Sequence, residues 1–153
     1  MDGKIEAIWV KRAQRGVMDP ASSVTLVRDH GVEGDASFGR SRRQVTLIEK
    51  EVFDRIRDRL PDATPDMRRA NFMLSGVRLE GTRGFVLTLG GARILIQGET
   101  RPCERMDEQC LGLTDALDPE WSGGVHGVVV EGGSVSVGDA ARIPGLSMSE
   151  GGV

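Results

Sequence analysis

A cysteine at position 103 has neighbours that favour chemistry over packing. It follows a proline in the segment IQGETRPCERM and is flanked by Arg101 and Arg105. Cations close to a sulfur favour the thiolate, the form that attacks electrophiles and binds metals. Glu99 and Glu104 act in the opposite direction, so the sign of the local field depends on the fold. We therefore take Cys103 as a candidate reactive or metal-binding thiol.

The second cysteine, Cys110, has a structural interpretation. The segment 106–117 carries apolar residues at the spacing of one helix face: Met106, Cys110, Leu113 and Leu117. On that helix, Cys110 would be a small buried hydrophobe. If Cys103 shared the helix, its seven-residue separation from Cys110 would span about 10 Å, which is too far for a disulfide.

A glycine-rich loop followed by arginines is a candidate anion site. Between residues 30 and 43 the chain contains Gly31, Gly34, Gly39, Arg40, Arg42 and Arg43. Glycines let backbone N–H groups approach an anion closely, and arginine binds phosphate through two parallel hydrogen bonds. The alternative is a solvated turn in which Asp35 accepts hydrogen bonds from its own backbone.

Two further segments give weaker signals. Asn71 follows the pair Arg68-Arg69, and its amide can both donate and accept, as recognition of a heterocycle edge requires. Paired arginines are nevertheless common on protein surfaces. His126 follows a diglycine in SGGVHG, but a lone histidine is more often an ordinary hydrogen-bonded residue than a catalyst.

Composition and missing motifs exclude several classes of function. The chain has two histidines, no H-E-x-x-H and no paired C-x-x-C, which argues against a dedicated zinc site. It also lacks a P-loop and a G-x-G-x-x-G after a strand. The pI of about 5.4, the absence of tyrosine and the 4% aromatic content argue against a nucleic-acid partner, because few rings are present to stack on bases.

The length of 153 residues fits one domain. We predict a single domain over residues 1–145 and a flexible tail over the small, polar residues 146–153. Charges at Asp2, Lys4 and Glu6 interrupt any apolar signal segment, and no apolar run approaches the roughly 20 residues of a membrane span. The expectation is a cytoplasmic protein with no membrane partner.

Hydrophobic patterning favours strands. Short alternating or apolar runs occupy residues 4–10, 23–27, 44–48, 85–89, 92–96, 125–130 and 134–137. The diglycines at 90–91 and 132–133 predict tight hairpins. A second pattern, at residues 49–60, has helical spacing and ends at Pro61. The prediction is a mainly β fold with a few short helices, closed or nearly closed into a barrel.

These segments together resemble a MOSC domain, a family named for its occurrence at the C-terminus of molybdenum cofactor sulfurases. The resemblance covers nearly the whole chain and rests on the order of six short motifs: Gly31-Val32-Glu33-Gly34-Asp35; Arg43-Gln44-Val45-Thr46-Leu47-Ile48; Arg69-Ala70-Asn71; Pro102-Cys103; Gly123-Gly124 with Gly127-Val128; and Gly138-Asp139. No single motif is specific, but their common order is.

The resemblance implies a β-barrel-centred fold that binds the molybdenum cofactor, an anionic pterin with a phosphate and a dithiolene-held metal. Cys103 would then be the metal ligand and a catalytic residue, and Asp35 and Glu33 would line the substrate side. The resemblance further implies a cofactor-binding set of Arg43, Arg69, Asn71, Gly34, Pro102, Gly123 and Gly124. A thiolate near arginines suits an electron-poor, oxo-rich molybdenum centre.

The sequence departs from the family pattern at one position. Many relatives have a histidine two residues after the Gly-Asp pair, where this chain has Ser37. If that histidine handles protons, its absence puts catalytic turnover in doubt while leaving cofactor binding possible. The pyridoxal-phosphate sulfurase domain fused to some relatives does not fit in 153 residues, so no pyridoxal phosphate is expected in this chain.

Three functions are compatible with these residues. The leading hypothesis is an oxidoreductase that uses the molybdenum cofactor to reduce a small N-hydroxylated or N-oxygenated substrate, with a separate electron donor. The second is a sulfur carrier that holds a persulfide on Cys103, supplied by a sulfur donor protein. The third is a non-catalytic binding module for a phosphorylated ligand.

Overall fold

The computed structural model describes residues 3–13, 17–40, 43–65, 70–100 and 124–144. These residues form eleven strands and one α-helix, in the order β1 (Gly3–Lys11), β2 (Met18–Ala21), β3 (Ser23–Val27), β4 (Gly31–Val32), β5 (Val45–Glu49), α1 (Lys50–Arg59), β6 (Phe72–Ser75), β7 (Val86–Leu89), β8 (Ala92–Glu99), β9 (Val125–Glu131), β10 (Gly133–Ser136) and β11 (Ala140–Arg142). The mainly β prediction is confirmed.

Seven of these strands close into a barrel. They follow one another in the order β11-β7-β8-β9-β5-β6-β1, and β1 pairs back onto β11. All neighbours are antiparallel except β5 and β6, which run parallel because α1 carries the chain between them and so returns it in the same direction. Closure leaves these seven strands without an unpaired edge, as the sequence-based prediction of a barrel required.

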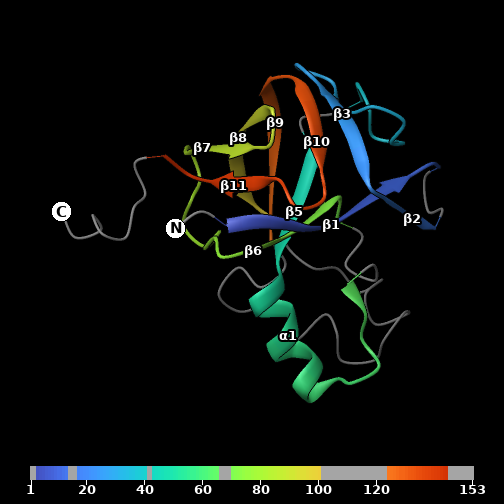
Figure 1. The fold of residues 1–153 in the computed structure, drawn as a ribbon, viewed down its shortest axis with the longest axis vertical. Helices are drawn as coiled ribbons and strands as arrows, with labels where there is room; N and C mark the ends of the chain where they lie inside the picture. Colours follow the sequence, from blue (N-terminus) through green and yellow to red (C-terminus); the bar gives the residue numbers. More distant parts are fainter. Residues whose placement is uncertain (1–2, 14–16, 41–42, 66–69, 101–123, 145–153) are drawn as a thin grey trace.

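A second, three-stranded sheet has the order β10-β3-β4 and packs against β8 and β9 of the barrel (Figure 1). It overturns the hairpin predicted at residues 132–133. β10 pairs with β3, not with β9. One edge of β9 is paired with β8, and the other is occupied by β5 at residues 125–127 and by the hydrogen bonds that Val129 makes with Gln44 and Asp29. The hairpin predicted at residues 90–91 is confirmed: Leu89 pairs with Ala92 across it, and Gly90 has a φ of 56°.

The barrel core is built by strand alternation. Inward-facing side chains of β1, β5, β6, β8 and β9 form one buried cluster that includes Val10, Leu47, Phe72 and Val129. Residues of the opposite phase face outward, and some of them form a small outer cluster of Ile48, Ala70 and Met73 with Trp9 packed against it. The outer surface of the barrel therefore includes a small apolar cluster beside the polar side chains of the candidate site.

The helix α1 begins directly after β5 and extends from one end of the barrel (Figure 1). It buries Phe53 and Ile56 against the barrel end, and its last turn carries Arg57 and Arg59, which suit the negative end of the helix dipole. The helix predicted over residues 106–117 and the tail predicted over 146–153 lie outside the described residues. No helix in the described part of the chain is long and apolar enough to cross a membrane.

Candidate functional site

Asp35, predicted to line the substrate side, is buried in a network of hydrogen bonds on the outer face of the barrel. Only 6% of the residue is exposed. Its Oδ1 accepts the backbone N–H of Lys11 at 2.7 Å and the side-chain amide of Asn71 at 3.1 Å. Its Oδ2 accepts the N–H and the hydroxyl of Ser37, at 3.1 and 2.7 Å. Four accepted hydrogen bonds fill the usual capacity of a carboxylate.

Asn71, predicted to bind the cofactor, is equally engaged and 4% exposed. Its Nδ2 donates to the Trp9 carbonyl at 3.2 Å as well as to Asp35, and its Oδ1 accepts the N–H and the hydroxyl of Thr46, both at 3.2 Å. All four hydrogen-bonding positions of the amide are therefore occupied by the protein. The interpretation of Asp35 as a turn residue that binds its own backbone, weighed above, also describes its contacts with Ser37.

A different set of polar groups gathers around His126 on β9. His126 lies directly opposite Thr46 of β5 on one side and Gly98 of β8 on the other. The side chains of Thr46 and His126 therefore share the outer face, and a side chain at position 98 would point to the same face. A Cβ built on Gly98 would lie 3.1 Å from an Nη of Arg83. The missing side chain of Gly98 thus leaves the space in which the Arg83 guanidinium lies beside His126.

The electrostatics of this cluster act on the imidazole. The pKa of His126 is lowered from its ordinary value of 6.5, first because the ring is partly buried and then because Arg43 and Arg83 add positive charge nearby. A long contact of 3.5 Å joins its Nδ1 to the hydroxyl of Thr100. We call Arg43, Arg83, Thr100 and His126 the arginine–histidine cluster; it brings together two guanidinium groups, a hydroxyl and an imidazole, side chains of the kind that bind anions.

The ends of β8 and β9 meet beside this cluster. The N–H of Thr100 donates to the carbonyl of Gly124 at 2.8 Å. Gly124 has a φ of 90°, and a Cβ at this position would overlap the carbonyl oxygen of Leu47. Gly124 is therefore required by the backbone here. Of the other predicted site residues, Cys103, Pro102, Gly123 and Arg69 lie outside the described residues.

Thr46 connects the two groups of side chains. Its hydroxyl donates to Asn71 and also accepts the Asn71 N–H at 3.0 Å, while its Cβ is the cross-strand neighbour of His126. The hydrogen-bond network of Asp35, Asn71, Thr46 and Ser37 thus fixes β5 and β6 in the register that supports His126. Gln44, one residue after Arg43, adds a buried tie to β9 through the Val129 N–H at 2.9 Å.

Glu33 and Gly34, two more predicted site residues, belong to another part of the surface. Glu33 is exposed and lines a pocket next to Val10 and Arg12, and Gly34 lies under the Arg12 guanidinium, whose Nη1 would be 3.1 Å from a Cβ at that position. Val10 faces the barrel interior, whereas Trp9 and Asn71 face outward. Glu33 and Asp35 are thus two residues apart in the sequence, but Glu33 lines this exposed pocket and Asp35 lies in the buried network with Asn71.

A larger hollow of about 500 Å³ lies beside α1. Two of its three carboxylates are tied to the backbone: Glu49 accepts the Leu79 N–H at 3.0 Å, and Glu51 accepts the Gly76 N–H at 2.8 Å. The third, Glu80, pairs with Arg78 at 3.1 Å. Burial raises the pKa of Glu49. These contacts hold the loop after β6 against the start of α1, which makes them structural.

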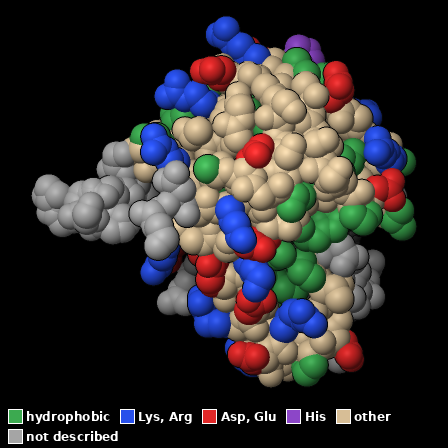
Figure 2. Space-filling view, viewed as in Figure 1, with side chains coloured by type: hydrophobic (Ala, Val, Ile, Leu, Met, Phe, Trp, Pro, Cys, Tyr) green, Lys and Arg blue, Asp and Glu red, His purple; other side chains and the backbone are tan. Residues whose placement is uncertain are grey.

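Local sequence gives little indication of Arg83 and Thr100. Arg83 lies in a turn, GTRG, and it reaches His126 because the register of β8 shifts between Ile96 and Gly98. No local motif indicates Thr100, because its contacts with His126 and Gly124 arise only from the pairing of β8 with β9. On the face shown in Figure 2, acidic and basic side chains are interspersed, so charge density on that surface does not single out a site either.

Comparison with known proteins identifies the family. The YuaD protein from Bacillus subtilis superposes with a TM-score of 0.77 at 22% identity, over 94% of this chain and 96% of that chain. YiiM from Geobacillus stearothermophilus gives 0.70 at 16%, over 92% and 74%, and YiiM from Escherichia coli gives 0.68 at 15%, over 92% and 69%. No curated protein matches. The family model of the MOSC domain matches residues 33–142, so this chain belongs to the MOSC family.

Proposed function

We propose that this protein binds the molybdenum cofactor, with Cys103 as metal ligand, and reduces small N-hydroxylated or N-oxygenated substrates. The proposal rests on membership of the MOSC family and on one observation, the gathering of Arg43, Arg83, Thr100 and His126 at the ends of β8 and β9. Cys103 follows Thr100 by three residues, a stretch that spans about 11 Å when fully extended.

The donors of the arginine–histidine cluster fit an anionic pterin phosphate. Guanidinium groups and a hydroxyl bind phosphate oxygens through charge-assisted hydrogen bonds. Among the described residues no group of three or more His, Cys, Asp and Glu could hold a metal ion. In the proposed complex the dithiolene of the cofactor would supply most of the metal's ligands, and Cys103 would add one.

Reduction of a hydroxylamine to an amine and water consumes two electrons and two protons and breaks the N–O bond. The cofactor, when bound, would supply the two-electron chemistry, and a separate redox protein would supply the electrons. His126, whose pKa is lowered by burial and by two arginines, would relay a proton toward the departing oxygen, accepting one at one ring nitrogen as it donates from the other. Asp35 and Asn71 would act as positioning residues, because their hydrogen-bonding capacity is already used.

The test is molybdenum per chain by elemental analysis, on protein purified from a host that makes the cofactor. Near-stoichiometric metal in the wild type and in Cys110→Ala, with none in Cys103→Ala, is the expected result. Cys110 is the matched control because it is the other thiol of the chain. Wild-type protein without molybdenum would contradict the proposal, and a persulfide on Cys103 in that protein, detected by mass spectrometry, would favour the sulfur carrier.

One contact favours the non-catalytic alternative. Ser37 stands where many relatives have histidine, and its hydroxyl is committed to Asp35, so no proton-handling group occupies that position. Binding of a phosphorylated ligand that persists in Cys103→Ala but is lost in an Arg43→Gln, Arg83→Gln double variant would favour a binding module over both Cys103-dependent functions.

A further inference from the structure

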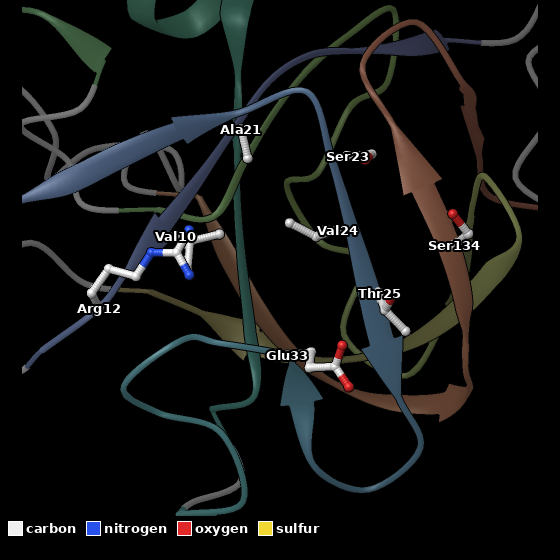
Figure 3. A pocket seen from close by; sticks show the side chains of 8 residues that line it. All are labelled: Val10, Arg12, Ala21, Ser23, Val24, Thr25, Glu33 and Ser134. Atoms are coloured by element: carbon white, nitrogen blue, oxygen red, sulfur yellow. The ribbon is translucent and has the colours of Figure 1, made fainter.

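A small pocket between the end of β1 and the strands β3 and β10 is lined by one positive and one negative side chain, Arg12 and Glu33. Its volume is about 280 Å³, close to the lower end of the range for small-molecule sites. Arg12 reaches it from the end of β1, and Glu33 from the turn after β4 (Figure 3). None of the residues of the arginine–histidine cluster lines it.

The two charges do not neutralise each other. Among the described residues, the ion pair of Arg12 is with Asp19, at 3.5 Å between Nε and Oδ2, with the Arg12 side chain 63% exposed. An exposed single contact of this kind is weak and leaves the outer edge of the guanidinium available. The Glu33 N–H is fixed by the Thr25 carbonyl at 2.9 Å, so the backbone that carries the carboxylate is anchored to β3.

The remaining wall is mixed. Val10 and Val24 supply apolar surface, and Val10 is 2% exposed, so one side of the pocket is continuous with the barrel core. Thr25 and Ser134, which face each other across the β3–β10 ladder, supply hydroxyl-bearing residues on the opposite side (Figure 3). A ligand here would need both a small aliphatic body and polar ends.

We infer that this pocket binds a small zwitterion, an α-amino acid with a short side chain, whose carboxylate contacts Arg12 and whose ammonium contacts Glu33. A simple anion would be disfavoured by Glu33 and Asp19, and a simple cation by Arg12. A molecule that carries both charges can pair with Arg12 and with Glu33 at once. The pocket would then select its ligand by repelling single charges as well as by attracting opposite ones. The inference does not depend on the proposed cofactor chemistry, because the two sites share no residue.

The experiment is an NMR titration of the full chain with L-alanine, followed through the backbone amides of Thr25, Glu33 and Ser134. Saturable shifts with a Kd of about 1 mM are expected. Propionate and ethylamine, which each lack one charged end, should bind about tenfold more weakly or not at all. Each of Arg12→Gln and Glu33→Gln should weaken alanine binding by about tenfold, the worth of one charge-assisted hydrogen bond.

Arg28→Gln is the matched control, since Arg28 is another exposed arginine in a weak ion pair, with Asp29 at 3.9 Å, and should leave the Kd unchanged. The inference is overturned if L-alanine gives no saturable shift at about ten times the expected Kd. Equal binding of propionate or ethylamine would overturn it as well, as would an unchanged Kd in both pocket variants. Both substitutions are at exposed residues, so the variants should fold, which their amide spectra will verify.

Discussion

The two polar groups on the outer face of the barrel differ in what their atoms contact. The Asp35–Asn71 network uses each carboxylate and amide position in bonds to the protein. The arginine–histidine cluster places two exposed arginines beside a partly buried imidazole. A buried network whose side chains bind one another stabilises the fold, whereas exposed cationic side chains can contact a ligand from solvent, so the two should respond differently to substitution.

The largest effect is expected at Gly124, under the arginine–histidine cluster. Gly124→Ala combines a positive φ of 90° with an overlap of the new Cβ and the Leu47 carbonyl. We expect a loss of about 4 kcal/mol or more in the free energy of unfolding, measured by urea denaturation. Gly138→Ala is the matched control, since Gly138 has a φ of 94° and no atom within 4 Å of a Cβ; it should lose about 1–2 kcal/mol. Equal losses would mean that conformation alone, without the overlap, sets the requirement for glycine.

Asn71→Ala tests whether the saturated network is structural. The substitution removes four side-chain hydrogen bonds and leaves the buried Asp35 Oδ1 and the Trp9 carbonyl short of a donor. The free energy of unfolding should fall by about 3 kcal/mol. Asp58→Ala, on the exposed face of α1, should change it by less than about 0.5 kcal/mol. A stable Asn71→Ala that had lost only ligand binding would assign Asn71 to the ligand after all.

The pKa of His126 tests the electrostatics of the arginine–histidine cluster. Arg43→Gln should raise this pKa, and Arg83→Gln should raise it by less, because each removes a positive charge that disfavours the imidazolium. NMR titration of the imidazole resonances measures both. Arg93→Gln is the control, since Arg93 pairs with Glu131 at the far end of the β8–β9 ladder. If the pKa of His126 changed in neither cluster variant, the two arginines would not act electrostatically on the imidazole.

The same lowered pKa predicts how stability depends on pH. The unfolded chain takes up a proton on His126 at its ordinary pKa of 6.5, before the folded chain does. As the pH falls below about 6.5, wild-type protein should therefore lose stability relative to His126→Gln, and the difference should be constant above that value. Denaturation midpoints of the two proteins across this range would measure it, and a difference that grew with rising pH would have the wrong sign.

The smallest effect is expected at Ser37. Ser37→Ala removes the 2.7 Å hydroxyl contact with Asp35 but keeps the backbone N–H bond at 3.1 Å. A loss of about 1–2 kcal/mol in the free energy of unfolding is expected, with molybdenum content unchanged. If Ser37→Ala lost the metal instead, the saturated network would have to take a direct part in binding, and the distinction between the two groups would fail.

Strand patterning predicted much of the barrel. The alternation of residues 23–27 matches β3, and the run at residues 4–10 lies within β1. The four-residue strand β2 escaped prediction because Pro20 argues against a strand interior. β10 was assigned to the wrong partner, since a diglycine between two apolar runs predicts a hairpin only when the first strand has an edge to offer.

By itself, the sequence determined the barrel class, the family, and the short motifs that contain Asp35, Asn71 and Cys103. Those follow from local periodicity and from the order of residues along the chain. Only the tertiary structure decided that Asp35 and Asn71 bind each other, that Glu33 faces another pocket, and that Arg83 lies over Gly98. The physical reason is that hydrogen-bond saturation and cross-strand neighbours depend on register between strands distant in sequence, which residue types alone do not specify.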